Sequence, residues 1–169
     1  FGGDAPAPVK KLDGKNYVLE LWHGPTCAFK DMALQIMPRL LTTAVKKGSS
    51  DKTIVILVAT SGDTGKAALE GFCDVDGTKI LVFYPKNGVS EVQKKQMTSQ
   101  PGSNTGVMGI AGNFDDCQSG VKRIFGDSEV AARLEAGGYV FSSANSINWG
   151  RLVPQVVYYF SAYADLVKS

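Results

Sequence analysis

A continuous apolar run at Thr53–Ala59 constrains the fold of this chain more than any other segment. Its middle consists of Ile, Val and Leu, and it lacks the alternation of polar and apolar residues that marks a strand with one exposed face. Runs of this kind are typical of strands buried on both faces, as in a parallel sheet covered by helices. The run therefore predicts an inner strand of such a sheet.

Segments of strand and helix character alternate along the rest of the chain. We expect strands near residues 17–22, 79–84, 106–110 and 139–142, and helices near 30–45, 64–73, 90–99, 114–124, 128–136 and 147–167. Alternation at this spacing indicates βαβ units with right-handed crossovers. The prediction is an α/β fold, an open parallel sheet of about four strands with helices on both faces, in a single domain over residues 1–169.

Individual residues refine the element ends. Pro38 and Pro154 should each kink a helix or mark its late start, because proline lacks an amide donor. Ser90 and Ser128 are the expected helix caps. The first dozen residues are rich in Gly, Pro and Ala and predict a loop, and Phe1 in place of Met suggests that further sequence precedes it.

Composition excludes several partners and compartments. The net charge of +2 and the dispersed basic residues give no reason to expect nucleic acid or a membrane surface as a partner. No apolar run approaches the roughly 20 residues of a membrane span, and the N-terminus lacks a signal-peptide pattern. Cys27, Cys73 and Cys117 are odd in number and far apart, so we expect reduced thiols and a cytoplasmic protein.

The single histidine, His23, limits the chemistry further. Without Cys-x-x-Cys or His-x-x-x-His spacing, no metal site is expected. A Ser-His-Asp triad would need His23 and a Gly-x-Ser-x-Gly turn, which is absent from the sequence, as is a Walker A motif. We interpret His23 as a structural residue at a strand end.

Lys30 is the first candidate for chemistry. It follows a His-Gly-Pro-Thr turn and the apolar pair Ala28-Phe29, and it opens a helix with apolar residues on one side. The positive end of that helix and burial beside Phe29 both favour the neutral amine, which is the form that condenses with an aldehyde. The alternative is an ordinary solvated lysine.

Two loops that follow strands are the other candidates. In Thr60–Gly65, glycines allow a tight turn, and the amides of the next helix can bind an anion. In Ser143–Asn148, Asn145 is the preferred ligand-facing residue. Because sites in open parallel sheets form at the carboxyl ends of strands, both loops should converge with Lys30. Each loop could instead be a turn whose polar side chains cap a helix.

Four motifs in order resemble the threonine synthases, which are fold-type II pyridoxal-phosphate enzymes: His23–Asp31, Ala59–Gly65, Tyr84–Lys86 and Ser143–Asn148. The resemblance covers nearly the whole chain. It implies pyridoxal 5'-phosphate as cofactor, attached to Lys30, and O-phosphohomoserine as the small-molecule substrate, converted with water to threonine and phosphate. Asn145, chosen from its place at a strand end, is the further candidate for binding this cofactor. The residues that the resemblance implies for substrate binding are Ser61, Gly62, Asp63, Thr64 and Gly65.

The chain also departs from the family pattern. Asp63 stands where many fold-type II relatives have asparagine, and its role is left open. Threonine synthases are much longer, and their grip on the cofactor phosphate and the partner of its pyridine nitrogen lie in parts that this sequence lacks. We therefore expect this chain to be the lysine-bearing domain of a two-domain enzyme and to be inactive alone. It should bind the cofactor weakly or not at all. It should also self-associate through the face that a large domain would cover.

Other interpretations stay open. Another fold-type II lyase, such as a serine/threonine dehydratase or a phospholyase-like homologue, would use the same lysine. A non-catalytic Rossmann-like module would need a Gly-x-Gly-x-x-Gly turn and an acidic residue after the next strand, whereas the chain has Ser-Gly-Asp-Thr-Gly and Tyr84-Pro85-Lys86. The chain alone could also fold as a scaffold that performs no chemistry.

Overall fold

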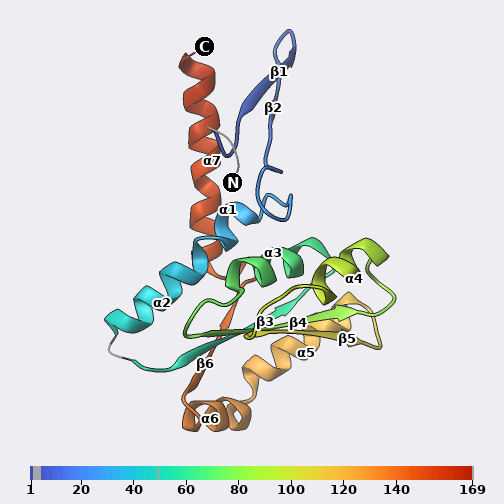
Figure 1. The fold of residues 1–169 in the computed structure, drawn as a ribbon, viewed down its shortest axis with the longest axis vertical. Coiled ribbons are helices and arrows are strands. Elements are labelled where there is room, and N and C mark those ends of the chain that lie inside the picture. The colour runs from blue at the N-terminus through green and yellow to red at the C-terminus, as the bar shows by residue number, and fades with distance from the viewer. Residues whose placement is uncertain (2–4, 49, 169) are drawn as a thin grey trace.

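The computed structural model describes residues 1, 5–48 and 50–168 of the 169-residue chain. A four-stranded parallel sheet lies at its centre, with the strand order β5-β4-β3-β6 (Figure 1). The strands are β3 (Thr53–Ala59), β4 (Thr78–Pro85), β5 (Thr105–Ile110) and β6 (Tyr139–Ser143). β3 pairs with β4 on one side and β6 on the other, and all its residues after Thr53 are buried. The predicted α/β fold, with its inner strand at 53–59, is confirmed.

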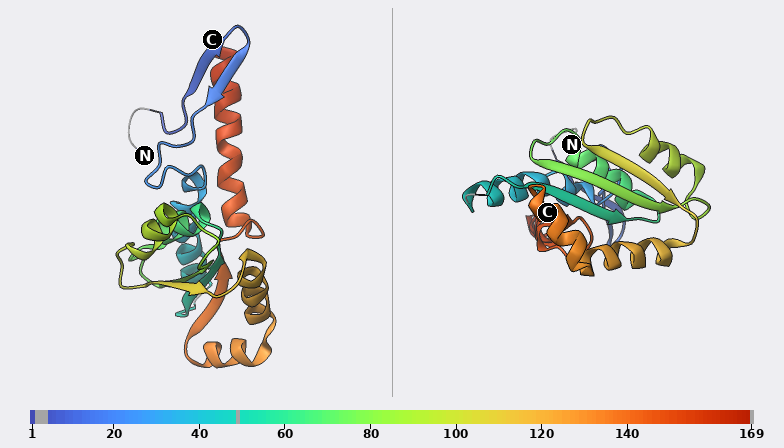
Figure 2. Two further views of the ribbon diagram at one scale, coloured as in Figure 1. Left: turned by 90° about the vertical axis from the view of Figure 1, so that its right-hand side faces the viewer. Right: turned by 90° about the horizontal axis from the view of Figure 1, so that it is seen from below.

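Helices cover both faces of this sheet. The helices of the described residues are α1 (Asp31–Leu34), α2 (Met37–Lys47), α3 (Asp63–Phe72), α4 (Glu91–Thr98), α5 (Phe114–Gly126), α6 (Ser128–Ala136) and α7 (Trp149–Lys168). α3 and α4 lie on one face and α5 on the other (Figure 2). One apolar cluster joins α1 and α3 to the sheet through side chains such as Leu34 and Leu69. A second packs Cys117 and Val121 of α5 against Leu57 on the opposite face.

The chain before the sheet differs from the prediction. β1 (Val9–Asp13) and β2 (Asn16–Leu19) form an antiparallel hairpin that stands beside α7, away from the parallel sheet (Figure 1). The loop predicted for the first dozen residues is therefore wrong from Val9 onward, and residues 2–4 lie outside the described part. The strand predicted at 17–22 is found as β2, outside the parallel sheet. Four of the five β1 residues are exposed, so this strand leaves no burial pattern in the sequence.

Pro38 marks the start of a helix. The one helix predicted from Lys30 onward is divided into α1, of four residues, and α2, which has Pro38 in its first turn. Proline suits this place because an amide there would have no partner inside the helix. The late start that Pro38 predicted is confirmed, and Pro154 lies inside α7 as predicted.

The two predicted serine caps have different outcomes. The Ser90 side chain accepts a hydrogen bond from the Gln93 amide and caps α4, as predicted. The prediction for Ser128 is wrong, because the carboxylate of Asp127 caps α6 by accepting from the two amides at Glu129 and Val130. An aspartate directly before a serine offers a charged acceptor at the same end, and it takes the cap position.

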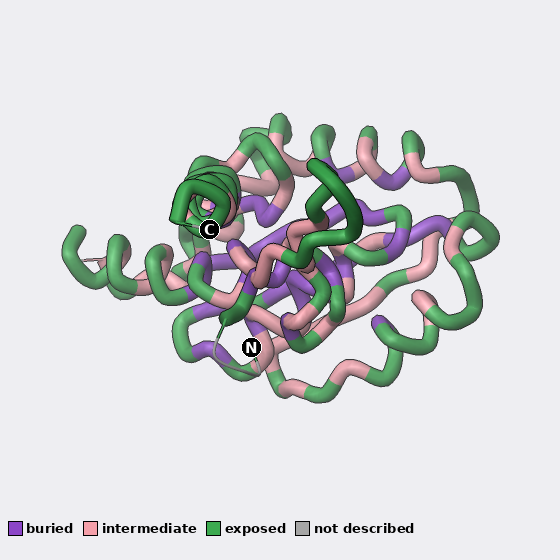
Figure 3. Tube along the Cα trace, turned by 90° about the horizontal axis from the view of Figure 1, so that it is seen from above, coloured by how far each residue is buried: buried purple, intermediate pink, exposed green. Residues whose placement is uncertain are grey.

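Most residues of α7, seen end-on beside the C-terminus in Figure 3, are exposed. It packs against α1 and α2, and Arg151 and Tyr158 are the buried residues within it. Its remaining large apolar side chains are mostly open to solvent, namely Trp149, Leu152, Val153, Val156, Val157, Tyr159, Phe160, Tyr163, Leu166 and Val167. A face of this size is typical of a surface that another part of a protein covers.

Candidate active site

Three segments meet where the parallel strands end. Residues 60–65 follow β3, residues 144–151 follow β6, and the loop with Lys30 leads into α1. Because β3 and β6 are parallel neighbours, their carboxyl ends open on the same edge of the sheet. Ala28 and Ala144 belong to the same apolar cluster as α3, which joins the Lys30 loop and the end of β6 to the helix after β3.

The Lys30 amine points at the loop after β3. Its Nζ lies 2.5 Å from Oδ2 of Asp63 and 4.3 Å from the centre of the Phe29 ring. The Lys30 side chain is 12% exposed, so the amine is largely enclosed. The fold thus brings together two of the predicted site residues that are 33 positions apart in the sequence.

The setting of Lys30 differs from the expected one in two respects. Lys30 precedes the first turn of α1 rather than lying in it, and α1 has only four residues, so little helix dipole acts on the amine. The amine also has an anionic partner in Asp63, and such a partner stabilises an ammonium ion more than a neutral amine.

Thr60, which sequence reasoning missed, organises the loop after β3. Its hydroxyl accepts hydrogen bonds from the amides of Gly62, at 3.0 Å, and Gly65, at 2.9 Å. Oδ1 of Asp63 accepts from the amide that follows it, at 2.9 Å. Three amides of the loop therefore already have partners inside the loop. A bound anion would use other amides or the exposed hydroxyl of Ser61.

The five predicted substrate-binding residues differ in exposure. Ser61 and Asp63 are exposed, Thr64 is half-buried, and Gly62 and Gly65 are buried. The two glycines shape the loop, and the three other side chains are the ones that a ligand could reach.

Gly62 brings the loop against α4. Its φ is +150°, which residues with a side chain rarely adopt, and a Cβ there would lie 2.3 Å from Nε2 of Gln93. Gln93 in turn closes the capping box of α4 with Ser90. The Gln93 amide therefore lies on the loop, and the Ser-x-x-Gln spacing was the signal that could have placed it at a helix start.

Asn145 makes its hydrogen bonds within its own turn. Its amide donates to Oγ of Ser143 at 3.0 Å, and this hydroxyl donates to Oδ1 of Asn145 at 3.4 Å. Among the hydrogen bonds of the described residues, none joins Asn145 to Lys30 or to the loop after β3. The role of Asn145 at the cofactor stays a prediction.

Arg151 is a second residue that sequence reasoning missed. Its side chain is buried, and its guanidinium donates to the carbonyl of Ala144 at 3.1 Å and to Oε1 of Gln155 at 3.4 Å. Burial lowers the pKa of this guanidinium from its ordinary value, and the carboxylate of Asp63 acts in the opposite direction. The Asp63 carboxylate therefore pairs with Lys30 and acts on Arg151 only through its charge. The only signal in the sequence was a cation in the first turn of a helix, where the dipole disfavours it.

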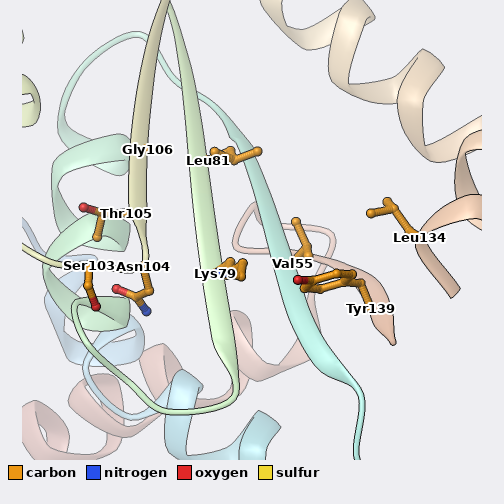
Figure 4. A pocket seen from close by; sticks show the side chains of 9 residues that line it. All are labelled: Val55, Lys79, Leu81, Ser103, Asn104, Thr105, Gly106, Leu134 and Tyr139. Atoms are coloured by element: carbon orange, nitrogen blue, oxygen red, sulfur yellow. The ribbon is translucent and has the colours of Figure 1, made fainter. Parts of the chain in front are cut away.

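A groove of about 340 Å³ lies elsewhere on the molecule (Figure 4). Its walls include Val55, Lys79, Leu81 and Tyr139, which come from the first halves of their strands. None of the predicted site residues lines this groove. It therefore has no part in the site at the carboxyl ends of the strands.

The helix after β5 is a poor place for a phosphate group. A capping box between Asn113 and Asp116 occupies its first amides, and Asp115 adds a further negative charge in the first turn. Negative charges there would repel a bound anion.

Metal and membrane sites were also sought. Among the described residues, no group of three or more His, Cys, Asp or Glu side chains could hold a metal ion. In the same part of the chain, no helix combines the length and apolar character needed to cross a bilayer.

Comparisons with known proteins find relatives along nearly the whole chain. It is 48% identical over 166 residues to the threonine synthase of Pseudomonas aeruginosa. This match covers 98% of this chain and 34% of that protein. It is 47% identical over 169 residues to human threonine synthase-like 1, covering 96% of this chain and 22% of that protein. The crystal structure of the PLP-bound threonine synthase from Brucella melitensis matches with a TM-score of 0.86 at 46% identity, over 98% of this chain and 34% of that one. No family model matches. The chain therefore spans between about a fifth and a third of the length of these relatives.

Proposed function

The chain is a homologue of the threonine synthases that matches about a third of such an enzyme, and from this premise we propose that it is the lysine-bearing domain of a pyridoxal-phosphate lyase. The proposed reaction of the whole enzyme converts O-phosphohomoserine and water to threonine and phosphate. The observation that carries the proposal is the enclosed Lys30 amine, 2.5 Å from Asp63 on the loop after β3.

Lys30 fits the aldehyde of pyridoxal phosphate. Covalent attachment needs a primary amine, and the Nζ of Lys30 is held in place by Asp63 and the Phe29 ring. When bound, the cofactor supplies an electron sink for the carbanion of an amino acid. When the Lys30 amine is free, it moves protons at the α and β carbons of the substrate. Asp63 is placed to hold the ammonium form of Lys30 between these transfers.

Polar groups of the site suit the carboxylate of the proposed substrate. Lys30 is paired with the carboxylate of Asp63, and the neighbouring carboxylate of Asp31 is bound by Thr26. The hydroxyl of Ser61 and free amides of its loop would bind the substrate carboxylate. Asn145 lies two residues after the end of β6, the neighbour of β3, and this position supports its proposed place beside the cofactor.

The remainder of the enzyme would complete this site. We propose that residues 1–169 form one α/β domain and that a second, large domain supplies the grip on the cofactor phosphate and the partner of its pyridine nitrogen. The exposed face of α7 is the surface proposed to meet that domain, and alone it would favour self-association. A cytosolic location is part of the proposal, supported by the three free cysteines.

Trapping of the cofactor tests the role of Lys30. Pyridoxal phosphate is added to the protein, the absorbance of the adduct is followed, and the bond is fixed with borohydride for peptide mapping. The adduct is expected at Lys30, only at cofactor concentrations well above that of the protein, and it should be lost in Lys30→Ala but not in Lys47→Ala, an exposed site on α2. Labelling confined to other lysines contradicts the assignment of Lys30. A tight, stoichiometric adduct contradicts the need for a second domain to hold the phosphate.

A second candidate is another lyase of the same fold. The 47% identity to a protein called threonine synthase-like 1, rather than threonine synthase, favours keeping it. Assays of the whole enzyme with O-phosphohomoserine, serine and threonine separate the two. Formation of threonine and phosphate supports the first candidate, and release of ammonia from serine or threonine supports the second.

A further inference from the structure

A buried carboxylate fixes the loop that carries Lys30. Asp31 follows Lys30 directly and is 0% exposed. Its Oδ1 accepts a hydrogen bond from the hydroxyl of Thr26 at 2.6 Å, and its Oδ2 accepts one from the amide of Thr26 at 2.8 Å. One side chain thus binds both polar hydrogens of a residue five positions earlier and closes the loop on itself.

The backbone of the loop is shaped around this contact. A Cβ on Gly24 would lie 2.5 Å from Oδ2 of Asp31, so a larger residue would push the carboxylate away. Cys27 has a φ of +57°, and its amide donates to the carbonyl of Gly24 at 3.1 Å. A positive φ at a residue other than glycine is unfavourable and persists only where surrounding contacts impose it. The two bonds between Thr26 and Asp31 are contacts of that kind.

Burial of Asp31 is costly unless the carboxylate is compensated. The neighbouring cation does not compensate it, because the ion pair of Lys30 is with Asp63. The compensation comes from the charge-assisted hydrogen bonds of Thr26. Because the buried carboxylate needs both donors to stay compensated, the two bonds impose one geometry on the loop.

We propose that Thr26 and Asp31 form a clamp that positions the Lys30 amine against Asp63. The clamp ties the loop to the packed body of the molecule, because α1 carries Asp31 and buries Ala33 and Leu34 completely. Its value for catalysis rests on the proposed function, in which this amine receives the cofactor. The clamp itself acts in the protein without cofactor, and both of its members are positioning residues.

Reductive methylation with formaldehyde and cyanoborohydride tests the clamp without pyridoxal phosphate. Thr26→Val keeps the shape of the side chain but removes the hydroxyl donor, and Asp31→Asn places an amide hydrogen where an acceptor is needed. The methylation rate of Lys30, read by mass spectrometry, is compared with that of Lys66. Lys66 is a matched internal reference, because it is 18% exposed and paired with Glu70.

Loss of the clamp should expose the Lys30 amine. In Thr26→Val and Asp31→Asn, the ratio of the Lys30 rate to the Lys66 rate is expected to rise about fivefold, the factor that corresponds to one net hydrogen bond. Thr26→Ser, which keeps the hydroxyl, should restore the wild-type ratio. Thr43→Val makes the same change at an exposed position of α2 and should leave the ratio unchanged.

The outcomes separate the clamp from the cofactor proposal. An unchanged ratio in both Thr26→Val and Asp31→Asn overturns the clamp, and so does a rise of equal size in Thr43→Val. Unfolding would accelerate Lys66 as well, so it cannot imitate a rise in the ratio. If the ratio rises while pyridoxal phosphate labels only other lysines of the wild type, the clamp stands and the assignment of the cofactor to Lys30 fails.

Discussion

Three aspartates hold three different turns of this protein. Asp31 closes the loop before α1. Asp63 accepts a hydrogen bond from the amide of Thr64 at the start of α3, and it also pairs with Lys30. Asp74 has a φ of +50° and accepts from the amide of Ser103 at 2.8 Å and its hydroxyl at 2.9 Å. Each carboxylate binds a backbone amide, but Asp63 alone among these three also contacts an amine at the carboxyl ends of the strands. The surroundings of each aspartate therefore decide whether it has a structural or a chemical role.

The charge of Asp74 predicts a pH dependence of stability. Its pKa lies below the ordinary value of 3.8, mainly because the amide and then the hydroxyl of Ser103 donate to the carboxylate. A carboxyl group whose pKa is lowered by folding stabilises the fold above its unfolded-state pKa, and the contribution is lost as the pH falls through the folded-state pKa. Asp74→Asn should therefore unfold at a lower urea midpoint than the wild type near neutral pH. The difference between the two midpoints should shrink well below pH 3.8.

Urea denaturation near neutral pH and again well below pH 3.8 measures this difference in midpoint. Asp76→Asn, at an exposed position two residues later, is the control and should change little at either pH. A gap of equal size at both pH values would mean that the charge of Asp74 contributes nothing.

The connection between β3 and α3 is the element on which the site depends most. It contains the Thr60 hydroxyl that binds two amides of the loop, and the backbone of Gly62 that lies under Gln93. A tight connection of this kind holds Asp63 at a fixed place relative to the strand, and therefore relative to Lys30.

Gly62→Ala should destabilise the protein by about 1–3 kcal/mol, because the new Cβ adds backbone strain and displaces Gln93. Gly120→Ala, in the middle of α5 with no atoms within 4 Å of the new Cβ, is the matched control. It should instead stabilise by about 0.5–1 kcal/mol, because alanine favours helix. Urea titration of the two variants gives both free energies of unfolding. Equal stability of the two would refute the strain at Gly62.

Elements with a strong burial pattern could be predicted from the sequence. β3 is recognisable because both of its faces are covered, so nearly all its residues are apolar. β1 leaves no such pattern, because it is mostly exposed. The division of the first helix into two was predictable only from Pro38. The apolar spacing continues across this residue and gives no sign of the break.

The candidate site was predictable where local motifs define it. The meeting of Lys30 with the loop after β3 follows from the rule that ligands bind at the carboxyl ends of parallel strands. Thr60, Gln93 and Arg151 were missed, because their roles depend on contacts with backbone groups or charges that only the folded chain brings near.

At the scale of the whole molecule, a layered body carries a projecting arm. The body is the parallel sheet with α3 and α4 on one face and α5 on the other, and the arm is α7 with the β1–β2 hairpin beside it (Figures 1 and 2). Phe160 and Tyr163 of the arm are 72% and 70% exposed. Exposure of such large rings to water is unfavourable, so we expect the arm to associate with another protein surface.

Sedimentation at increasing protein concentration should therefore show reversible association. The double change Phe160→Ser with Tyr163→Ser should weaken it, because it removes two large apolar side chains from the arm. Val92→Ser, on the body in α4 and 68% exposed, is the control and should leave association as in the wild type. A strict monomer at high concentration contradicts the proposed role of the arm.

The strand order has a consequence for synthesis on the ribosome. Among the strands of the described residues, β6 comes latest in the chain, yet it pairs with β3, the first strand of the parallel sheet. Until residues 139–143 emerge, a nascent chain that already holds Lys30 and Asp63 leaves one edge of its most apolar strand unpaired. That open edge is a template for wrong pairing with other chains, so the interval between these two strands is when a growing polypeptide of this kind most needs a chaperone.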